Sequence, residues 1–172
     1  MRLLFAIDLQ DYADCTYTFR RDSARAIILR EGKVAMVHSL RDDYYKLPGG
    51  GIEKGESTID AMIRETREEA GLIVKPETVR EYGYVHRIQR GGRDPQECFI
   101  QDNFYYLCEV EEEIHAPQLE VSEAEAGFVL EFVDARHAIR TNRESALDSR
   151  YRTMLTREAQ VLELLINEGI IA

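Results

Sequence analysis

The chain has 172 residues, of which 44% are apolar and 31% charged; this is typical of a globular protein with one core, so we expect a single domain over residues 1–172. Its formal net charge of −10 argues against non-specific binding to nucleic acid or to an anionic membrane, because both need a basic surface. The three cysteines form no CxxC pair and no apolar run is long enough to span a membrane, which predicts reduced thiols and a cytoplasmic protein.

The N-terminal part of the chain predicts short strands. Residues 3–9 form the first candidate strand. Residues 24–30 and 33–39 are rich in apolar and β-branched side chains, which predicts two further strands. A turn at Glu31-Gly32 would join them. The next segment, residues 47–57 with the sequence LPGGGIEKGES, predicts a loop, because its four glycines are turn and loop residues.

A helix is predicted immediately after this loop. Ser57 fits an N-cap, with Asp60 three residues later as in a capping box, and Gly71 fits the C-terminal stop. Between them, apolar residues recur at helical spacing and form a stripe about 100° wide that we expect to face the core. The residues of this stripe are Ile59, Met62, Ile63, Thr66 and Ala70.

The second half of the chain predicts a hairpin, a loop and a strand. Residues 79–90 and 98–110 are rich in aromatic and β-branched side chains and flank a turn-like segment at 91–96, so they predict a long antiparallel hairpin. Residues 111–126 are acidic and poorly periodic, and we expect a loop there. Residues 127–133 predict a strand.

Two helices are predicted in the remaining sequence. Asp134 fits the N-cap of a short helix over residues 134–139, and a long helix is predicted over residues 152–168, where Gly169 ends it. The apolar stripe of the long helix consists of Leu155, Ala159, Leu162, Leu165 and Ile166. Strands and helices in this order predict a mixed α/β or α+β fold with helices on the faces of a sheet.

Three glutamates crowd the C-terminal end of the first predicted helix. Glu65, Glu68 and Glu69 stand at positions i, i+3 and i+4 on one helix face, where each like-charged pair costs about 0.2–0.5 kcal/mol. They also lie at the negative end of the helix dipole. A solvated acidic face is the ordinary explanation. The alternative is a preformed site for a cation such as Mg²⁺, which binds carboxylate and carbonyl oxygens.

The spacing of residues around this helix resembles a known signature. Gly50, Glu56 and the run RETREEAGL at residues 64–72 match the seven fixed positions of the Nudix box, G-x5-E-x7-R-E-U-x-E-E-x-G-U, in which U is an apolar residue. A chance match in a chain of this length has a probability of about one in a million at average residue frequencies. Thr66 departs from the pattern, because an aliphatic residue is usual there, and we expect it to pack in the core.

The resemblance over Gly50–Leu72 implies the fold and the metal site of Nudix hydrolases. The implied fold is an α/β/α sandwich, in which helices flank a mixed β-sheet. The implied cofactor is Mg²⁺, for which Mn²⁺ can substitute. The implied ligands are Glu65, Glu68, Glu69 and the carbonyl oxygen of Gly49. Arg64 and Glu56 are expected to pair and to fix the loop against the helix, and they join the three glutamates as implied catalytic residues.

Two further groups of residues belong to the expected site. The backbone of Gly50 and Gly51 can approach a substrate phosphate, because no side chain intervenes. A general base or an additional metal ligand can come from the acidic segment before the strand at residues 127–133. The candidates are Glu120, Glu123 and Glu125. We favour Glu123 or Glu125, although a solvated loop is the better explanation for any one of them taken alone.

The activity implied by the resemblance is hydrolysis of a nucleoside diphosphate linked to another moiety, with water attacking phosphorus. ADP-ribose, a nucleotide sugar and an oxidised nucleoside triphosphate are the candidate substrates. We therefore expect a small nucleotide as the partner, with no nucleic acid and no membrane, and a homodimer is a further possibility. Two alternatives stay open. A non-catalytic Nudix-fold sensor would bind a nucleotide without cleaving it, and an RNA cap hydrolase would need a basic groove, against which the net charge of −10 speaks.

Overall fold

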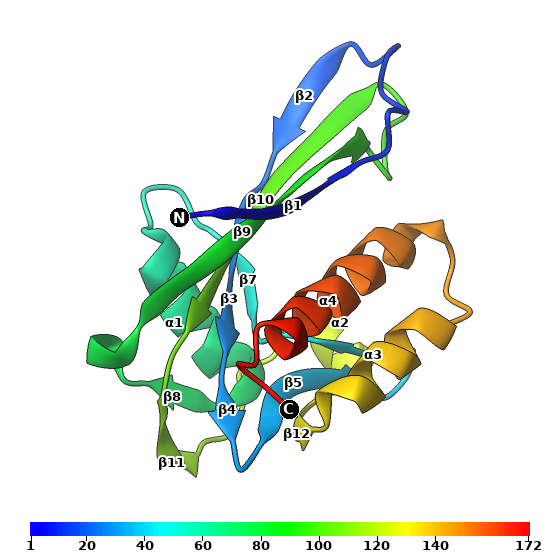
Figure 1. Cartoon of the computed structure of the whole chain (residues 1–172). Helices are drawn as coiled ribbons and strands as arrows, with labels where there is room; N and C mark the ends of the chain where they lie inside the picture. Colours follow the sequence, from blue (N-terminus) through cyan, green and yellow to red (C-terminus); the bar gives the residue numbers. More distant parts are fainter.

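The computed structural model describes residues 1–172, apart from the side chains of Ser149 and Arg150. Its largest sheet has six strands (Figure 1). These are β1 (Leu3–Asp8), β2 (Tyr17–Arg20), β3 (Ser23–Ile27), β7 (Gly49–Gly51), β9 (Arg80–Arg90) and β10 (Glu97–Leu107). The sheet is mixed, because β1 runs parallel to β9 and β3 parallel to β10, whereas β9 and β10 are antiparallel.

Two smaller sheets hold the remaining strands. A four-stranded sheet is formed by β4 (Leu29–Arg30), β5 (Lys33–Ser39), β6 (Tyr44–Lys46) and β12 (Phe128–Val133). An antiparallel pair is formed by β8 (Leu72–Val74) and β11 (Val110–Ile114). The pair of strands lies next to the C-terminal end of the first helix, because β8 begins one residue after the residue that caps that helix.

Helices cover both faces of the large sheet. The helices are α1 (Thr58–Ala70), α3 (Ala135–Glu144) and α4 (Ser149–Asn167), together with the short α2 (Val121–Glu125), which lies beside β12, and a 3₁₀ turn at Pro76–Thr78. Tyr106 of β10 belongs to the core cluster that includes α1, whereas its neighbour Tyr105 belongs to the cluster that includes α3 and α4. Figure 1 shows α3 and α4 side by side, away from α1. The predicted sandwich of helices around a mixed sheet is confirmed.

Most of the longer predicted elements are present at nearly the expected bounds. The hairpin is β9 and β10, which pair from Cys98–Arg90 to Leu107–Arg80. The predicted long helix is α4, and the predicted short helix is α3, which is capped by Asp134 as expected but continues to Glu144. No helix of the described chain has both the length and the apolar character that a membrane span requires.

Two expectations for the first fifty residues are wrong. Residues 24–30 do not form one strand, since the chain leaves the large sheet after Ile27 and enters the small sheet at Leu29. Burial does not mark this break, because every residue from Ala24 to Ile28 is buried. The glycine-rich segment is not only a loop, because Gly49–Gly51 form strand β7 and pair with β3.

The expectation of a loop at residues 111–126 is also wrong. Strand β11 occupies its start and helix α2 lies near its end. Both elements are short and mostly exposed, and β11 contains three consecutive glutamates, so neither leaves a clear apolar period in the sequence.

The buried face of α1 differs from the predicted stripe. Ile59 is 39% exposed, whereas Ala61 is fully buried and Glu69 is only 2% exposed. Thr66 lies in the core with no exposed surface, as expected. The helix therefore buries one of the three acidic side chains that a solvated face would leave in water.

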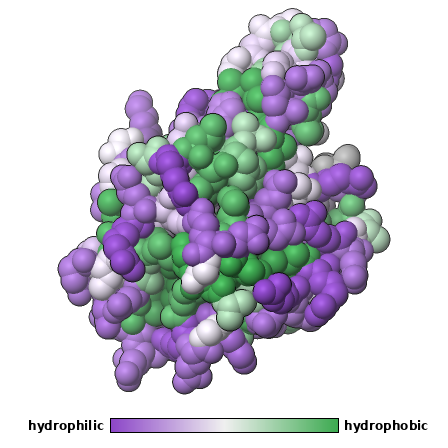
Figure 2. Space-filling view, in the orientation of Figure 1, coloured by the Kyte–Doolittle hydropathy of each residue, from purple (hydrophilic) through white to green (hydrophobic). Residues whose placement is uncertain are grey.

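The distal halves of β9 and β10 extend beyond the body together with β1 and β2 (Figure 1). We call this extension the arm. Large apolar side chains stay exposed on it, including Leu9, Tyr17 and Phe19, and apolar patches lie among hydrophilic ones in the space-filling view (Figure 2).

Candidate functional site

Local hydrogen bonds define both ends of helix α1. The Ser57 hydroxyl accepts a hydrogen bond from Asp60 N at 3.1 Å, which caps the first turn. Gly71 ends the helix in the left-handed conformation with a φ of 67°, and its N–H donates to Arg67 O. Helix start and stop are thus fixed by local chemistry.

Arg64 gathers the acidic residues of the loop and the helix. Its Nε and Nη2 atoms lie 2.8 and 2.9 Å from the two carboxylate oxygens of Glu56, which is a bidentate pair. Its Nη1 donates to Glu65 at 2.7 Å and to Glu68 at 3.1 Å, and Nη2 donates to the carbonyl of Gly51 at 3.1 Å. One guanidinium therefore ties the glycine-rich segment to α1.

These contacts shift the acidity of the carboxyl groups. The bidentate bond from Arg64 lowers the pKa of Glu56 to about 2. Burial raises the pKa of Glu65 above its ordinary value, although the hydrogen bond from Arg64 opposes that change. The pKa values of the two carboxyl groups therefore shift in opposite directions, because the arginine bond is the larger influence on Glu56 and loss of hydration is the larger influence on Glu65.

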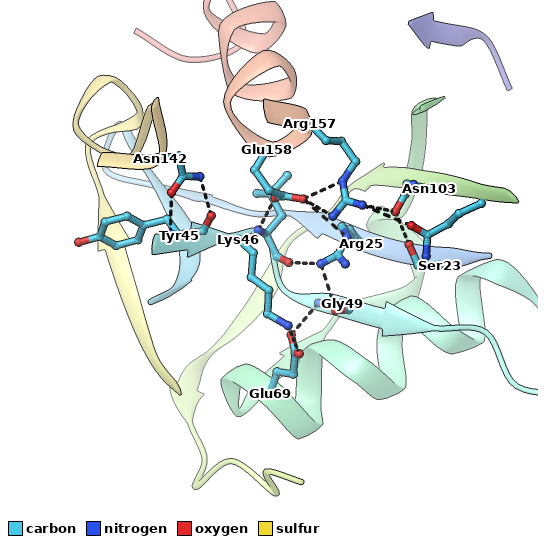
Figure 3. Close-up of polar contacts among 12 residues, drawn as sticks. Ser23, Arg25, Tyr45, Lys46, Gly49, Glu69, Asn103, Asn142, Arg157 and Glu158 are labelled. Carbon is cyan, nitrogen blue, oxygen red and sulfur yellow. Dashed lines mark hydrogen bonds and ion pairs between the residues drawn. The ribbon is translucent and has the colours of Figure 1, made fainter. Parts of the chain in front are cut away.

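Glu69 faces the protein interior (Figure 3). One of its carboxylate oxygens contacts the Lys46 ammonium, and the other accepts a hydrogen bond from Gly49 N at 3.1 Å. Lys46 is itself buried, and its ammonium lies 4.6 Å from the ring centroid of Phe128. No sequence pattern predicts this cation, because Lys46 belongs to β6 and meets α1 only in the folded chain.

Among the three candidates of the acidic segment, Glu123 is the one brought next to the box. Burial, together with the neighbouring carboxylate of Glu69, raises its pKa to about 7. One oxygen of Glu123 accepts a hydrogen bond from Glu120 N at 2.9 Å, at the start of α2. Glu125 is exposed on α2, and Glu120 is exposed at the rim of a pocket.

That pocket, of about 320 Å³, lies over the outer face of α1. Its wall includes Arg21, Gly51, Arg64, Glu65, Glu68 and Glu120. Arg21 lies beside Gly51, since a Cβ atom on this glycine would be 3.0 Å from Arg21 Nε. Sequence reasoning missed Arg21, because a lone exposed arginine between two short strands carries no pattern.

The glycines of the loop are needed for close contacts. A Cβ atom on Gly49, whose φ is +141°, would lie 2.2 Å from the carbonyl oxygen of Ala24. A Cβ atom on Gly50 would lie 2.3 Å from a carboxylate oxygen of Glu65. Backbone and carboxylate therefore meet where no side chain intervenes.

We expect Gly49→Ala and Gly50→Ala to have different effects. Gly49→Ala clashes with fixed backbone, so it should lower the free energy of unfolding by about 1–3 kcal/mol. Gly50→Ala meets only the end of the Glu65 side chain, which can turn away, so it should displace that carboxylate with a smaller loss. Urea denaturation measures both, and Gly92→Ala is the control, because nothing lies near its added methyl. Equal losses of unfolding free energy in Gly49→Ala and Gly50→Ala would show that the two glycines do not differ in this way.

The high pKa of Glu123 predicts a pH-dependent stability. Its folded-state pKa of about 7 exceeds the ordinary value of 4.5, so the stability that it contributes is present below pH 4.5 and is lost as the pH rises through 7. Since solvent screens a partly exposed carboxyl, we expect a loss of about 1–2 kcal/mol. Denaturation of wild type and Glu123→Gln in EDTA from pH 4.5 to 8 measures it. An unchanged pH profile in the variant would contradict the shift.

The oxygen atoms around α1 are suitable donors for a divalent cation, but other side chains hold them. Among the described residues, no three carboxylate, imidazole or thiolate groups converge on one point, because Arg64 holds Glu65 and Glu68 while Lys46 holds Glu69. The oxygen donors nevertheless suit Mg²⁺, which prefers carboxylates and retains several waters. Glu65 and Glu68 line the open pocket. The three glutamates therefore fit a divalent cation that takes the place of Arg64 and Lys46 as their positive partner.

Known proteins provide an independent comparison. The family model described as NUDIX domain matches residues 19–152. An RNA pyrophosphohydrolase of Psychrobacter sp. (strain PRwf-1) is 29% identical over 101 residues, which cover 55% of this chain and 58% of that protein. An uncharacterised Nudix hydrolase of Bacillus subtilis (strain 168) is 34% identical over 69 residues, which cover 40% of this chain and 44% of that protein. The chain thus spans about half the length of these curated relatives.

The solved structures agree with respect to the fold. A NUDIX hydrolase from Nitrosomonas europaea is similar with a TM-score of 0.58 and 16% identity, over 83% of this chain and 90% of that chain. The family match covers most of the sequence and contains the whole segment from Gly50 to Leu72. The resemblance first noted in the box is therefore confirmed, and the chain belongs to the Nudix family.

Proposed function

We propose that this protein is a divalent-metal-dependent Nudix pyrophosphohydrolase that cleaves a nucleoside diphosphate linked to another moiety. The observation that carries the proposal is the cluster around Arg64, which binds Glu56 of the loop and holds Glu65 and Glu68 at the wall of a pocket of about 320 Å³. A solvated acidic face would not need an arginine that donates five hydrogen bonds to the helix and the loop. The pocket also exposes the backbone of Gly51 to a bound phosphate.

The proposed cofactor is Mg²⁺, with Mn²⁺ as a substitute. The residues that would hold it are Glu65, Glu68, Glu69 and the carbonyl of Gly49. A divalent cation at this position would neutralise diphosphate charge and lower the pKa of a bound water. Arg64 keeps Glu56 ionised and the loop fixed, and the missing side chains at Gly50 and Gly51 let Glu65 and Arg21 approach the loop closely. Arg21 adds a positive charge to the wall of the pocket, beside Gly51.

We propose Glu123 as the general base. A base works best when its pKa lies near the operating pH, and burial raises that of Glu123 to about 7. Its carboxylate lies next to Glu69, so it could take a proton from a water at the metal site. The exposed Glu125 has no comparable support, and Glu120 remains a candidate for contact with substrate at the pocket rim.

A small nucleotide is the proposed substrate, with RNA ends as the second candidate. ADP-ribose, nucleotide sugars and oxidised nucleoside triphosphates all contain the diphosphate that this site suits. The relative from Psychrobacter is named an RNA pyrophosphohydrolase, which favours 5′-triphosphorylated RNA as an alternative. The net charge of −10 favours the small molecule, because a polynucleotide needs a basic surface.

The proposed function is tested by a substrate screen with Mg²⁺ or Mn²⁺. Purified protein is incubated with ADP-ribose, nucleotide sugars, 8-oxo-dGTP, dNTPs and 5′-triphosphorylated RNA, and the products are separated by chromatography. We expect the protein to hydrolyse at least one small nucleotide, and to hydrolyse it faster than 5′-triphosphorylated RNA. Tight binding without turnover would instead support the nucleotide sensor, and faster turnover of RNA would reverse the order of the two substrates.

Three broader expectations stay as proposals. We propose a single catalytic domain over residues 1–172 and a cytoplasmic location, which the three free thiols Cys15, Cys98 and Cys108 support. We also propose that two copies associate through the N-terminal strands, since the arm leaves Leu9 and Phe19 exposed. Light scattering after size-exclusion chromatography decides between monomer and homodimer.

A further inference from the structure

The pairing of β3 with β7 leaves the backbone groups of Gly49 without partners in the sheet. Ala26 N donates to Pro48 O at 2.9 Å, and Ile52 N donates to Asp22 O at 3.0 Å, on either side of this glycine. Hydrogen-bonded and non-hydrogen-bonded pairs alternate in antiparallel strands, so Gly49 falls at a non-hydrogen-bonded position. Its N–H and C=O groups therefore need partners from elsewhere.

Charged side chains supply both partners (Figure 3). The N–H of Gly49 donates to Glu69 at 3.1 Å. The C=O of Gly49 accepts a hydrogen bond from Arg25 Nη1 at 3.2 Å, and the same nitrogen donates to Leu47 O at 2.9 Å. Arg25 is only 7% exposed, so water competes little for these bonds.

Helix α4 reaches the same loop from the opposite layer. Glu158 has no exposed surface, and one of its oxygens accepts a hydrogen bond from Leu47 N at 2.7 Å. Its other oxygen lies 3.8 Å from Arg25 Nε and accepts bonds from Arg157 at 2.8 and 3.1 Å. Burial alone would raise the pKa of Glu158, but the two arginines and the Leu47 N–H outweigh it, so the pKa is lowered and the carboxylate is charged.

We propose that Arg25 and Glu158 are positioning residues, which orient the Gly49 peptide so that its carbonyl and Glu69 are presented together to the divalent cation. The inference deepens the proposed function and rests on it. Neither side chain would touch substrate or metal. Groups that orient metal ligands by hydrogen bonds commonly change metal affinity when they are replaced.

A purely structural role for the same charges makes a different prediction. Buried ion pairs often contribute little net stability, because desolvation offsets their attraction, yet breaking one is destabilising. Under that alternative, removal of any arginine of the network lowers stability and leaves metal affinity unchanged. Metal affinity therefore separates the two explanations, whereas stability does not.

The test compares Arg25→Lys with Arg157→Lys. Both changes replace a buried guanidinium that contacts Glu158, but only Arg25 also holds the backbone of the loop. Lysine keeps the positive charge and loses the planar fork. Mn²⁺ is titrated into each purified protein, and the free ion is followed by its electron paramagnetic resonance signal. Thermal unfolding of the same samples reports stability.

We expect Arg25→Lys to bind Mn²⁺ at least about tenfold more weakly than wild type, with a lower kcat. Arg157→Lys should stay within about twofold of wild-type affinity, despite a similar loss of stability. Equal affinities in wild type and Arg25→Lys, or equal losses in the two variants, would overturn the inference. If Arg25→Lys does not fold, Glu158→Gln takes its place with the same expectation. A wild-type protein that binds no Mn²⁺ and cleaves no nucleotide overturns the proposed function itself.

Discussion

A Glu69→Gln protein is expected to lose about three orders of magnitude in kcat, which corresponds to roughly 4 kcal/mol of barrier. Glutamine has nearly the same shape and can still accept the hydrogen bond from Gly49 N, so the loop keeps its contact. It cannot, however, offer a charged oxygen to Mg²⁺ or act on the acidity of Glu123. The loss should appear in kcat more than in KM, because binding of the nucleotide uses other parts of the pocket.

The measurement is steady-state hydrolysis of the best substrate from the screen, below the melting temperature of the variant. Glu125→Gln is the matched control, because Glu125 is exposed on α2 and should tolerate the same chemical change. Wild-type activity in Glu69→Gln would remove this residue from the proposed metal site. A comparable loss in the control would point to a general effect of the acidic segment.

Lys46→Met is expected to lower the free energy of unfolding by about 3–5 kcal/mol in EDTA. Lys46 is the cation that contacts the buried carboxylate of Glu69, and Glu123 lies close by. Without the ammonium, the buried Glu69 carboxylate would lack an opposite charge, and the half-buried Glu123 would lie beside it. The double variant with Glu69→Gln should recover most of the loss, because the anion that needs compensation is gone.

Urea denaturation of the single and double variants gives the coupling between the two residues. An exposed pair provides the scale: Arg143 and Glu163 are 47% and 38% exposed, so Arg143→Met should cost less than about 1 kcal/mol. If Lys46→Met costs no more than this control, the interior pair does not stabilise the fold. If the double variant is as unstable as the single one, the loss comes from packing and not from charge.

The sequence predicted the local part of this site. Ser57 and Gly71 mark the ends of α1 by capping chemistry, and the helical spacing brings Glu65 and Glu68 together at the pocket, although Glu69 turns to the interior. The contact of Arg64 with Glu56 spans eight residues, so it lies within the range of a motif. Local signals of this kind do not depend on the rest of the fold.

The non-local part could not be predicted. Lys46 and Glu69 are 23 residues apart, and Leu47 and Glu158 are 111 residues apart. A lysine before a glycine-rich loop and a glutamate on an amphipathic helix are ordinarily solvated, and only the folded chain buries them. The short elements β11 and α2 were missed for a related reason, since their stability comes from contacts with β8 and with the body of the protein.

The position of Glu158 in the chain bears on when the site can form during synthesis. The glycine-rich segment and the acidic helix leave the ribosome well before α4, yet the amide of Leu47 is held by a carboxylate of α4. Contacts between distant residues form late, because a long stretch of chain must first be ordered. We therefore expect a nascent chain that ends before α4 to contain every residue of the Nudix box. It would still lack the hydrogen bond that holds the glycine-rich segment in its folded position.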